Sequence, residues 1–166
     1  MTTADLAPVS ALTAAEKAAA AAARSLLPLV AETVRHQFPD AAFLVLTREY
    51  DEDELELDSV RTANGKIVWS FRWDHTGYER FPKPVPAELA ALWGADDPQD
   101  PAPVQDLVQR IDRFARIGFL APSAMRMGEA NADRTPLGIP LVEEPKRCAV
   151  CQTPIAEHAG RICPRP

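Results

Sequence analysis

The sequence predicts an α+β domain in which helices cover one face of a three-stranded antiparallel meander. Residues 42–73 hold three short runs: the first is apolar and turns polar, and the other two alternate apolar and polar side chains with the period of two that is typical of half-buried strands. Residues 104–117 instead repeat apolar side chains at every third or fourth position, as an amphipathic helix does. An apolar sheet face must be buried against something, so we expect this helix to cover it.

The three expected strands occupy residues 42–50, 55–63 and 66–73. Alternation in the third strand places four large apolar side chains on the face that we expect the helix to bury: Ile67, Trp69, Phe71 and Trp73. Asn64-Gly65 stands between the last two strands, and this dipeptide is the strongest short signal for a type I′ turn, which needs positive φ at both central residues. The sequence therefore predicts a hairpin at this point.

Further helices are expected on both sides of the meander. Thr13 and Glu16 form a capping-box pattern, and the alanines that follow favour a helix by propensity alone. Pro28 should end or kink this helix, unless Ser25 caps a second helix that has Pro28 in its first turn. Apolar side chains at helical spacing predict two more helices, over residues 26–38 and 86–93.

These patterns divide the chain into four segments. An alanine-rich, flexible helical lead-in over residues 1–24 precedes the α+β domain of residues 25–119, and alanine buries so little area that we expect a solvated helix, with a partner-helix surface as the alternative. Residues 120–147 lose all periodicity to Pro, Gly and isolated charges, which predicts an irregular linker. Residues 148–166 form a separate tail.

Composition narrows the class of protein. A net charge of -6 disfavours a general nucleic-acid or membrane binder. Asp5 and the Glu16-Lys17 pair are unlike a secretory signal, and no apolar run is long enough to span a membrane, so we expect no membrane partner. The excess of Arg over Lys and the abundant Ala indicate a bacterial origin. All three cysteines lie in the tail, which favours a reduced, cytoplasmic protein with a metal site over a disulfide framework.

The tail contains four candidate metal ligands: Cys148, Cys151, His158 and Cys163. Their order resembles that of a CCHC zinc knuckle, although six residues separate Cys151 from His158 where the family has four. This resemblance covers the tail alone, and it implies a closed, tetrahedral site for structural zinc. A redox-sensitive thiol cluster and a tail without a role are the alternatives.

A zinc knuckle that binds nucleic acid uses basic side chains for phosphates and apolar or aromatic ones for stacking. The basic residues are present, at Lys146, Arg147, Arg161 and Arg165. Residues 146–166 contain no Phe, Trp or Tyr, however, and three thiolates would leave the metal site anionic. We therefore favour a protein-docking or purely structural role for the tail over nucleic-acid binding.

Two other features admit a functional interpretation. The acidic rim at Asp51, Glu52, Asp53 and Glu54 has the donors for a hard cation or the charge for a basic partner, but it is more simply a solvated hairpin loop. His75 beside Asp74 hints at acid–base catalysis, but no nucleophile elbow, phosphate loop or zinc-protease motif accompanies it. We interpret this segment as a polar turn.

The sequence as a whole favours a small non-enzymatic bacterial adaptor that acts through an unknown protein partner and carries structural zinc. A nucleic-acid-associated regulator that binds through the tail is the first alternative. A small enzyme that uses His75 is the second.

Overall fold

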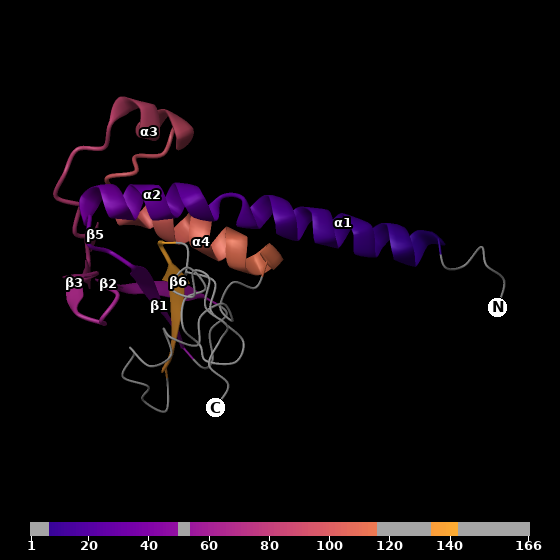
Figure 1. Ribbon diagram of the computed structural model, residues 1–166, viewed down its shortest axis with the longest axis horizontal. Helices are drawn as coiled ribbons and strands as arrows, with labels where there is room; N and C mark the ends of the chain where they lie inside the picture. The colour runs from indigo at the N-terminus through magenta and orange to yellow at the C-terminus, as the bar shows by residue number, and fades with distance from the viewer. Residues whose placement is uncertain (1–6, 50–53, 116–133, 143–166) are drawn as a thin grey trace, which may run out of the picture.

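The computed structural model describes residues 7–49, 54–115 and 134–142, and it confirms the α+β class (Figure 1). Its helices are α1 (Ala7–Arg24), α2 (Leu27–Gln37), α3 (Ala87–Leu92) and α4 (Pro101–Ala115). Its strands are β1 (Phe43–Glu49), β2 (Leu55–Arg61), β3 (Ile67–Ser70), β4 (Trp73–Asp74), β5 (Gly77–Tyr78) and β6 (Arg134–Pro140). The main sheet is antiparallel with strand order β3-β2-β1-β6, and β4 and β5 form a separate small hairpin.

Strand β1 is the centre of the sheet and of the core. It pairs with β2 on one side and with β6 on the other. Residues Ala41 to Leu46 are all buried, although successive side chains of a strand point to opposite faces. Leu44 and Leu46 belong to the main hydrophobic core, and Phe43 and Val45 to a second, smaller cluster. The β1 strand is therefore buried on both of its faces.

The prediction of an irregular linker over residues 120–147 is wrong for β6, which runs antiparallel along β1. Two prolines hide this strand in the sequence: Pro136 pairs with Thr47, and Pro140 pairs with Phe43. A proline has no backbone N–H, so both pairs are of the non-hydrogen-bonded kind, in which backbone groups point away from the partner strand. An edge strand tolerates proline at these positions, and the domain consequently extends to Val142.

The two N-terminal helices begin where proline allows it. Helix α1 starts at Ala7 with Pro8 in its first turn, so the predicted N-cap at Thr13 is wrong. The Thr13 hydroxyl instead donates a hydrogen bond to the Val9 carbonyl inside the helix. Pro28 lies in the first turn of α2, as one of the two alternatives predicted, but the Ser25 hydroxyl donates back to Ala22 and does not cap α2.

The hairpin between β2 and β3 is confirmed, but its turn differs from the predicted one. The Gly65 N–H donates to the Thr62 carbonyl, so the turn has Ala63 and Asn64 at its centre. Gly65 follows with φ of 85°, which is typical of a three-residue loop that ends in a glycine bulge. Gly65 is needed for its positive φ, but it follows the two central residues of the turn, whereas in the predicted type I′ turn it would be the second of them.

Helix α4 covers the sheet at β1 and β2 rather than at the predicted β3 face. The Gln109 amide donates to the Leu55 carbonyl at 3.1 Å, and the Arg48 guanidinium pairs with Asp112. A register shift beside Val60 breaks the alternation of β3, which leaves Ile67 exposed. Trp69 and Phe71 do pack on the core, but they meet Phe38 and Phe81, with ring centroids 5.3 and 5.9 Å apart.

The segment around α3, residues 81–93, is held on α2 by buried polar contacts, and we call it the α3 segment. The Trp93 indole N–H donates to the Thr33 hydroxyl at 3.0 Å, and this hydroxyl donates in turn to the Leu29 carbonyl. Gln37 is likewise buried, and its side chain makes hydrogen bonds with both the N–H and the carbonyl of Lys83. These bonds fix α3 as a wall beside α2.

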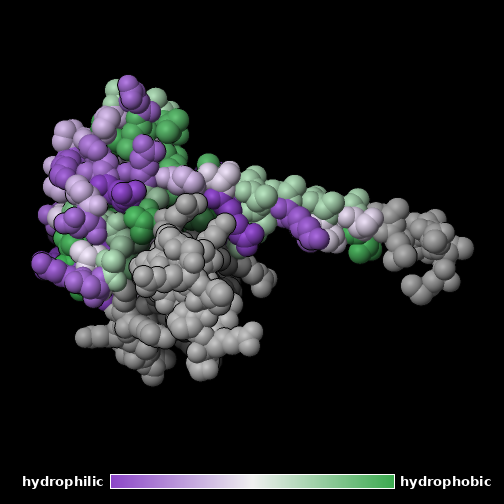
Figure 2. All heavy atoms as spheres, viewed as in Figure 1, coloured by the Kyte–Doolittle hydropathy of each residue, from purple (hydrophilic) through white to green (hydrophobic). Residues whose placement is uncertain are grey.

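Helix α1 leaves the body of the domain (Figures 1 and 2). Only its last turns meet α4, and every residue from 8 to 19 is exposed. At about 1.5 Å per residue, the helix is roughly 27 Å long. Within the described ranges, no helix combines the length and the apolar character that crossing a bilayer requires.

We predict that Thr33→Val lowers the free energy of unfolding by about 1–3 kcal/mol, because the buried indole N–H of Trp93 loses its acceptor. Urea unfolding followed by circular dichroism measures the change. In a Trp93→Phe background the same substitution should cost clearly less, since no donor is left unpaired. Strictly additive costs of the two changes would show that this hydrogen bond does not stabilise the α3 segment.

Candidate interaction surfaces

The candidate metal ligands Cys148, Cys151, His158 and Cys163 lie outside the described residues. The basic side chains beside them also lie outside: Lys146, Arg147, Arg161 and Arg165. So do three members of the acidic rim, Asp51, Glu52 and Asp53. In the part of the chain that the structure describes, no group of three or more His, Cys, Asp or Glu side chains could hold a metal ion. Zinc binding therefore stays a prediction from the sequence.

The other two sequence candidates are exposed. Glu54, the described member of the acidic rim, lies just before β2 with its side chain exposed. His75 occupies the two-residue turn between β4 and β5, and Gly77, the first residue of β5, has a φ of 115°. The interpretation of residues 74–77 as a polar turn is confirmed. His75 is exposed at its tip and lines none of the three grooves described below.

The first surface is the projecting part of α1. Alanine makes this helix by propensity, and its inner end is anchored by Ala23, which is buried, and by Arg24, whose guanidinium donates to the Ala115 carbonyl at 2.9 Å. Farther out, Val9 and Leu12 are 61% and 60% exposed. At 100° per residue these two side chains lie on the same side of α1 as Ala23. The stripe that packs on α4 therefore continues onto a part of α1 that nothing described covers.

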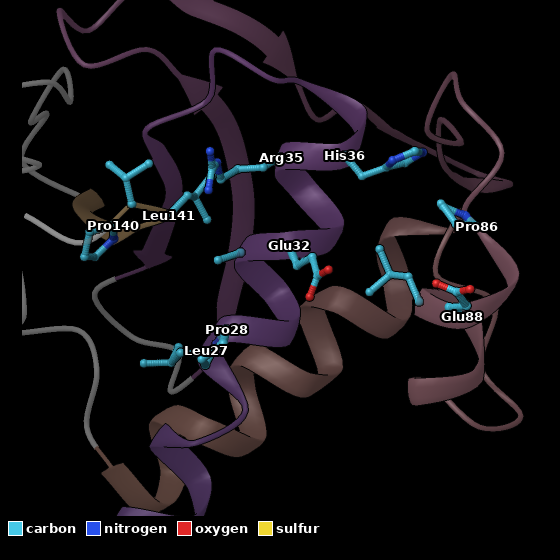
Figure 3. A pocket seen from close by; sticks show the side chains of 12 residues that line it. Leu27, Pro28, Glu32, Arg35, His36, Pro86, Glu88, Pro140 and Leu141 are labelled. Atoms are coloured by element: carbon cyan, nitrogen blue, oxygen red, sulfur yellow. The ribbon is translucent and has the colours of Figure 1, made fainter.

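The second surface is a groove across α2, with a volume of about 1030 Å³ (Figure 3). One wall is the end of β6 and the two residues after it, and the other is the start of α3. Leu27, Ala31 and the buried Leu141 supply apolar surface on one side of α2. Figure 3 shows Arg35 directed toward Leu141, whereas Glu88 lies on the far side of α2. We call this feature the α2 groove.

A third surface, of about 540 Å³, lies between α2, α3 and α4. Its exposed apolar residues are Leu26 and Leu92, which are 41% and 65% exposed. Charges of both signs surround them: Asp96, Asp106, Arg110 and Arg113. An apolar centre with a polar rim is typical of surfaces that bind other proteins.

A polar recess of about 430 Å³ lies beside Tyr78, with Glu54, Glu56 and Asp58 around it. The Tyr78 hydroxyl donates a hydrogen bond to the Gln105 side chain and so ties β5 to α4. Burial raises the pKa of Tyr78 above its usual 10.0, the hydrogen bond with the Leu57 backbone acts against this rise, and the charge of Glu56 adds to it. The phenol is therefore neutral at physiological pH and has a structural role.

The outer edge of β6 is poorly suited to strand addition. Its outward-pointing positions include residues 136, 138 and 140, and two of these three are prolines. Each proline removes a backbone donor that an added strand would need. A partner of this domain is therefore better placed on its helices than along β6.

Sequence reasoning missed the residues that form these surfaces. The apolar pair Val9 and Leu12 was hidden because the alanines around it gave no stripe of large side chains. The α2 groove depends on Leu141 and Arg35, which are brought together only by β6. No local pattern indicates that contact, since the pairing partner of β6 lies far away in the sequence.

Comparisons of this chain with protein-family models, with curated proteins and with solved structures found no match. Its function must therefore be inferred from the surfaces themselves.

We predict that the tyrosine in the recess produces a specific loss of stability at high pH. Because the folded pKa of Tyr78 is raised, the unfolded chain releases this proton first, and unfolding becomes easier as the pH rises above 10.0. Tyr78→Phe should remove this part of the alkaline loss while keeping Tyr50, the other tyrosine, as an internal reference. Urea unfolding of both chains at neutral and alkaline pH measures it. Equal alkaline slopes in the two chains would contradict the prediction.

Proposed function

We propose that this chain is a non-enzymatic bacterial adaptor that acts by binding another protein through the projecting part of α1. The observation that carries this proposal is the exposed pair Val9 and Leu12 on a helix that extends beyond the domain. A short helix without tertiary contacts is only marginally stable in water, so a partner surface would stabilise this part of α1.

The expected mode of recognition is a helix in a groove. Side chains three and four positions apart form one face of a helix, and partners with an apolar groove bind such a face. Val9 and Leu12 are the apolar anchors, while Glu16 and Lys17 supply charges of both signs at their inner end. The prolines on the outer edge of β6 support the same mode, because they disfavour strand addition at that edge.

Structural zinc in residues 148–166 is the second part of the proposal. Three cysteines and one histidine fit the donor set of a closed tetrahedral site, which would order a tail that contains few large apolar side chains. The cysteine content also supports a cytoplasmic location, where thiols stay reduced. In this proposal the tail is a structural module or a second protein contact.

The other two interpretations are distinguished from this one by direct experiments. Salt-dependent binding to DNA or RNA that is lost in Cys151→Ser would replace the adaptor with a nucleic-acid-associated regulator. Turnover of any substrate that disappears in His75→Ala would replace it with an enzyme.

We predict that the double variant Val9→Asp, Leu12→Asp loses binding to the partner of α1. Burying one such side chain contributes about 1.5–3 kcal/mol, so each substitution should weaken binding by about tenfold or more. The partner is first isolated from an extract of the source bacterium on the immobilised full chain. It is then purified, and its Kd for each variant is measured by calorimetry.

The matched control moves the same two changes to the opposite face of α1. Ala11→Asp, Ala14→Asp shifts each substitution by two positions, or about 200° around the helix, at a similar distance from its N-terminus. This control should bind as the unchanged chain does. Equal losses in both variants, or no saturable partner at all, would overturn the proposed role of α1.

We predict one zinc ion per chain, lost in Cys148→Ser and in His158→Ala, because a closed tetrahedral site needs all four ligands. Elemental analysis of the purified protein measures the metal directly. His75→Ala is the matched control, since it removes a histidine outside the motif, and it should retain the full metal content. Protein that carries no zinc after folding with zinc supplied would refute the site.

A further inference from the structure

The exposed side of α1 that contains Leu12 complements the groove between α2, α3 and α4. We propose that two copies of this chain form an antiparallel dimer, in which each copy places the outer half of its α1 against this groove of the other. The dimer requires no other protein, so the inference does not depend on the adaptor proposal. Where both hold, the second copy and the protein partner compete for Leu12.

The first argument is the spacing of side chains along α1. Four exposed residues alternate steps of three and four, which is the heptad spacing of a coiled-coil contact: Leu12, Ala15, Ala19 and Ala22. The same steps continue to Leu26 and Leu29, and both of these line the groove. Figure 1 shows α1 and α2 following nearly one line. We call this row of six residues the α1 seam, and it runs from the outer part of α1 into the groove.

The second argument is the order of sizes along the α1 seam. Alanines occupy its middle and leucines its two ends. Two seams that run in opposite directions therefore pair Ala19 with Ala22 at the centre and Leu12 with Leu29 at each end. Small central side chains let the two helices approach closely, because the distance between helix axes depends on the side chains at the contact. A parallel pair would bring Leu12 to Leu12 and leave the groove empty, so the pattern favours the antiparallel order.

The third argument is closure. In the antiparallel pair, Leu12 of each copy reaches Leu26 and Leu29 of the other, at the wall of the groove that α2 provides. Val9, almost one turn farther out, then enters the groove toward the exposed Leu92. Each copy supplies one projection and one groove, so the contact forms twice about a twofold axis and no site remains for a third copy.

The fourth argument is charge. At about 100° per residue, Glu16 lies on the same side of the α1 seam as Ala23, the side that packs on α4. In an antiparallel pair the equivalent sides of the two seams adjoin, so Glu16 faces α4 of the other copy. There, Arg110 and Arg113 are exposed and line the groove. None of these three side chains makes a salt bridge within the described part of the chain. The charges therefore favour a second copy as the occupant.

The test measures association of the full chain by sedimentation velocity, from about 1 μM to about 1 mM. The paired segments, residues 12–29, span only about 26 Å, and an interface this small should give a dimer with a Kd on the order of 10–100 μM. Ala19→Glu should raise this Kd by about tenfold or more, because a charged side chain replaces alanine at the centre of the contact. Ala21→Glu, about 200° around the helix and equally exposed, should leave the Kd unchanged. Circular dichroism checks that both variants are folded.

Charge reversal tests the pairing of Glu16 with α4. Glu16→Arg should raise the dimer Kd by about three- to tenfold, because the dimer contains this pair twice. Adding Arg110→Glu and Arg113→Glu should restore the original Kd. The matched control adds Arg35→Glu instead, which reverses an exposed arginine outside this groove and should not restore it.

A photoreactive benzophenone amino acid at Val9 locates the contact. Irradiation of a mixture of isotope-labelled and unlabelled chains should cross-link it to residues 92–110 of the other copy, as identified by mass spectrometry. The same residue at Ala21 should give no such product. The proposal is overturned by a monomer at every concentration, by equal effects of Ala19→Glu and Ala21→Glu, or by cross-links from Val9 to any other region. None of these outcomes bears on the affinity for a protein partner, which calorimetry measures separately.

Discussion

The fold depends on the burial of β1 on both faces and its pairing on both sides. Leu44 and Leu46 contribute to the main core beneath the helices, and Phe43 and Val45 are buried on the other face. Side chains of this size contribute about 1.5–3 kcal/mol each when they are fully buried, so this strand contributes strongly to the stability of the sheet. It also provides the backbone partner for β6, and through β6 it creates one wall of the α2 groove.

Polar contacts then position the elements that apolar packing leaves undetermined. The α3 segment contributes Phe81, Leu89 and Trp93 to the interior, but these contacts alone do not fix its orientation. The hydrogen bonds from Trp93 to Thr33 and between Gln37 and Lys83 do, because each has a defined direction and is costly to leave unmade in the interior. The wall of the α2 groove that the start of α3 forms is therefore held in a fixed place beside α2.

Sequence reasoning succeeded where the signal is local. An apolar run identified β1, alternation identified β2 and β3, and the spacing of Val104, Val108 and Ile111 identified α4. It failed at β6, because the stability of that strand comes from the exposed edge of β1 and its own residues include two prolines. The α2 groove could not be predicted for the same reason. The anchors on α1 could, in principle, have been found from the shared helical face of Val9, Leu12 and Ala23, but the large alanine content obscured this face.

The direction of α1 is set by the core rather than by its own sequence, and this bears on how an adaptor would work. At the junction with α2, the Leu26 N–H donates to the Ala23 carbonyl, and the Leu26 carbonyl accepts from the Leu29 N–H. A second attachment is the Arg24 guanidinium, which donates a hydrogen bond to the Ala115 carbonyl in the last described turn of α4. The hydrogen-bonded turn at Leu26 and the Arg24 anchor together restrict how far α1 can pivot on the domain. A protein bound at Val9 and Leu12 would therefore be held at a defined orientation to the domain, at a distance set by the length of α1.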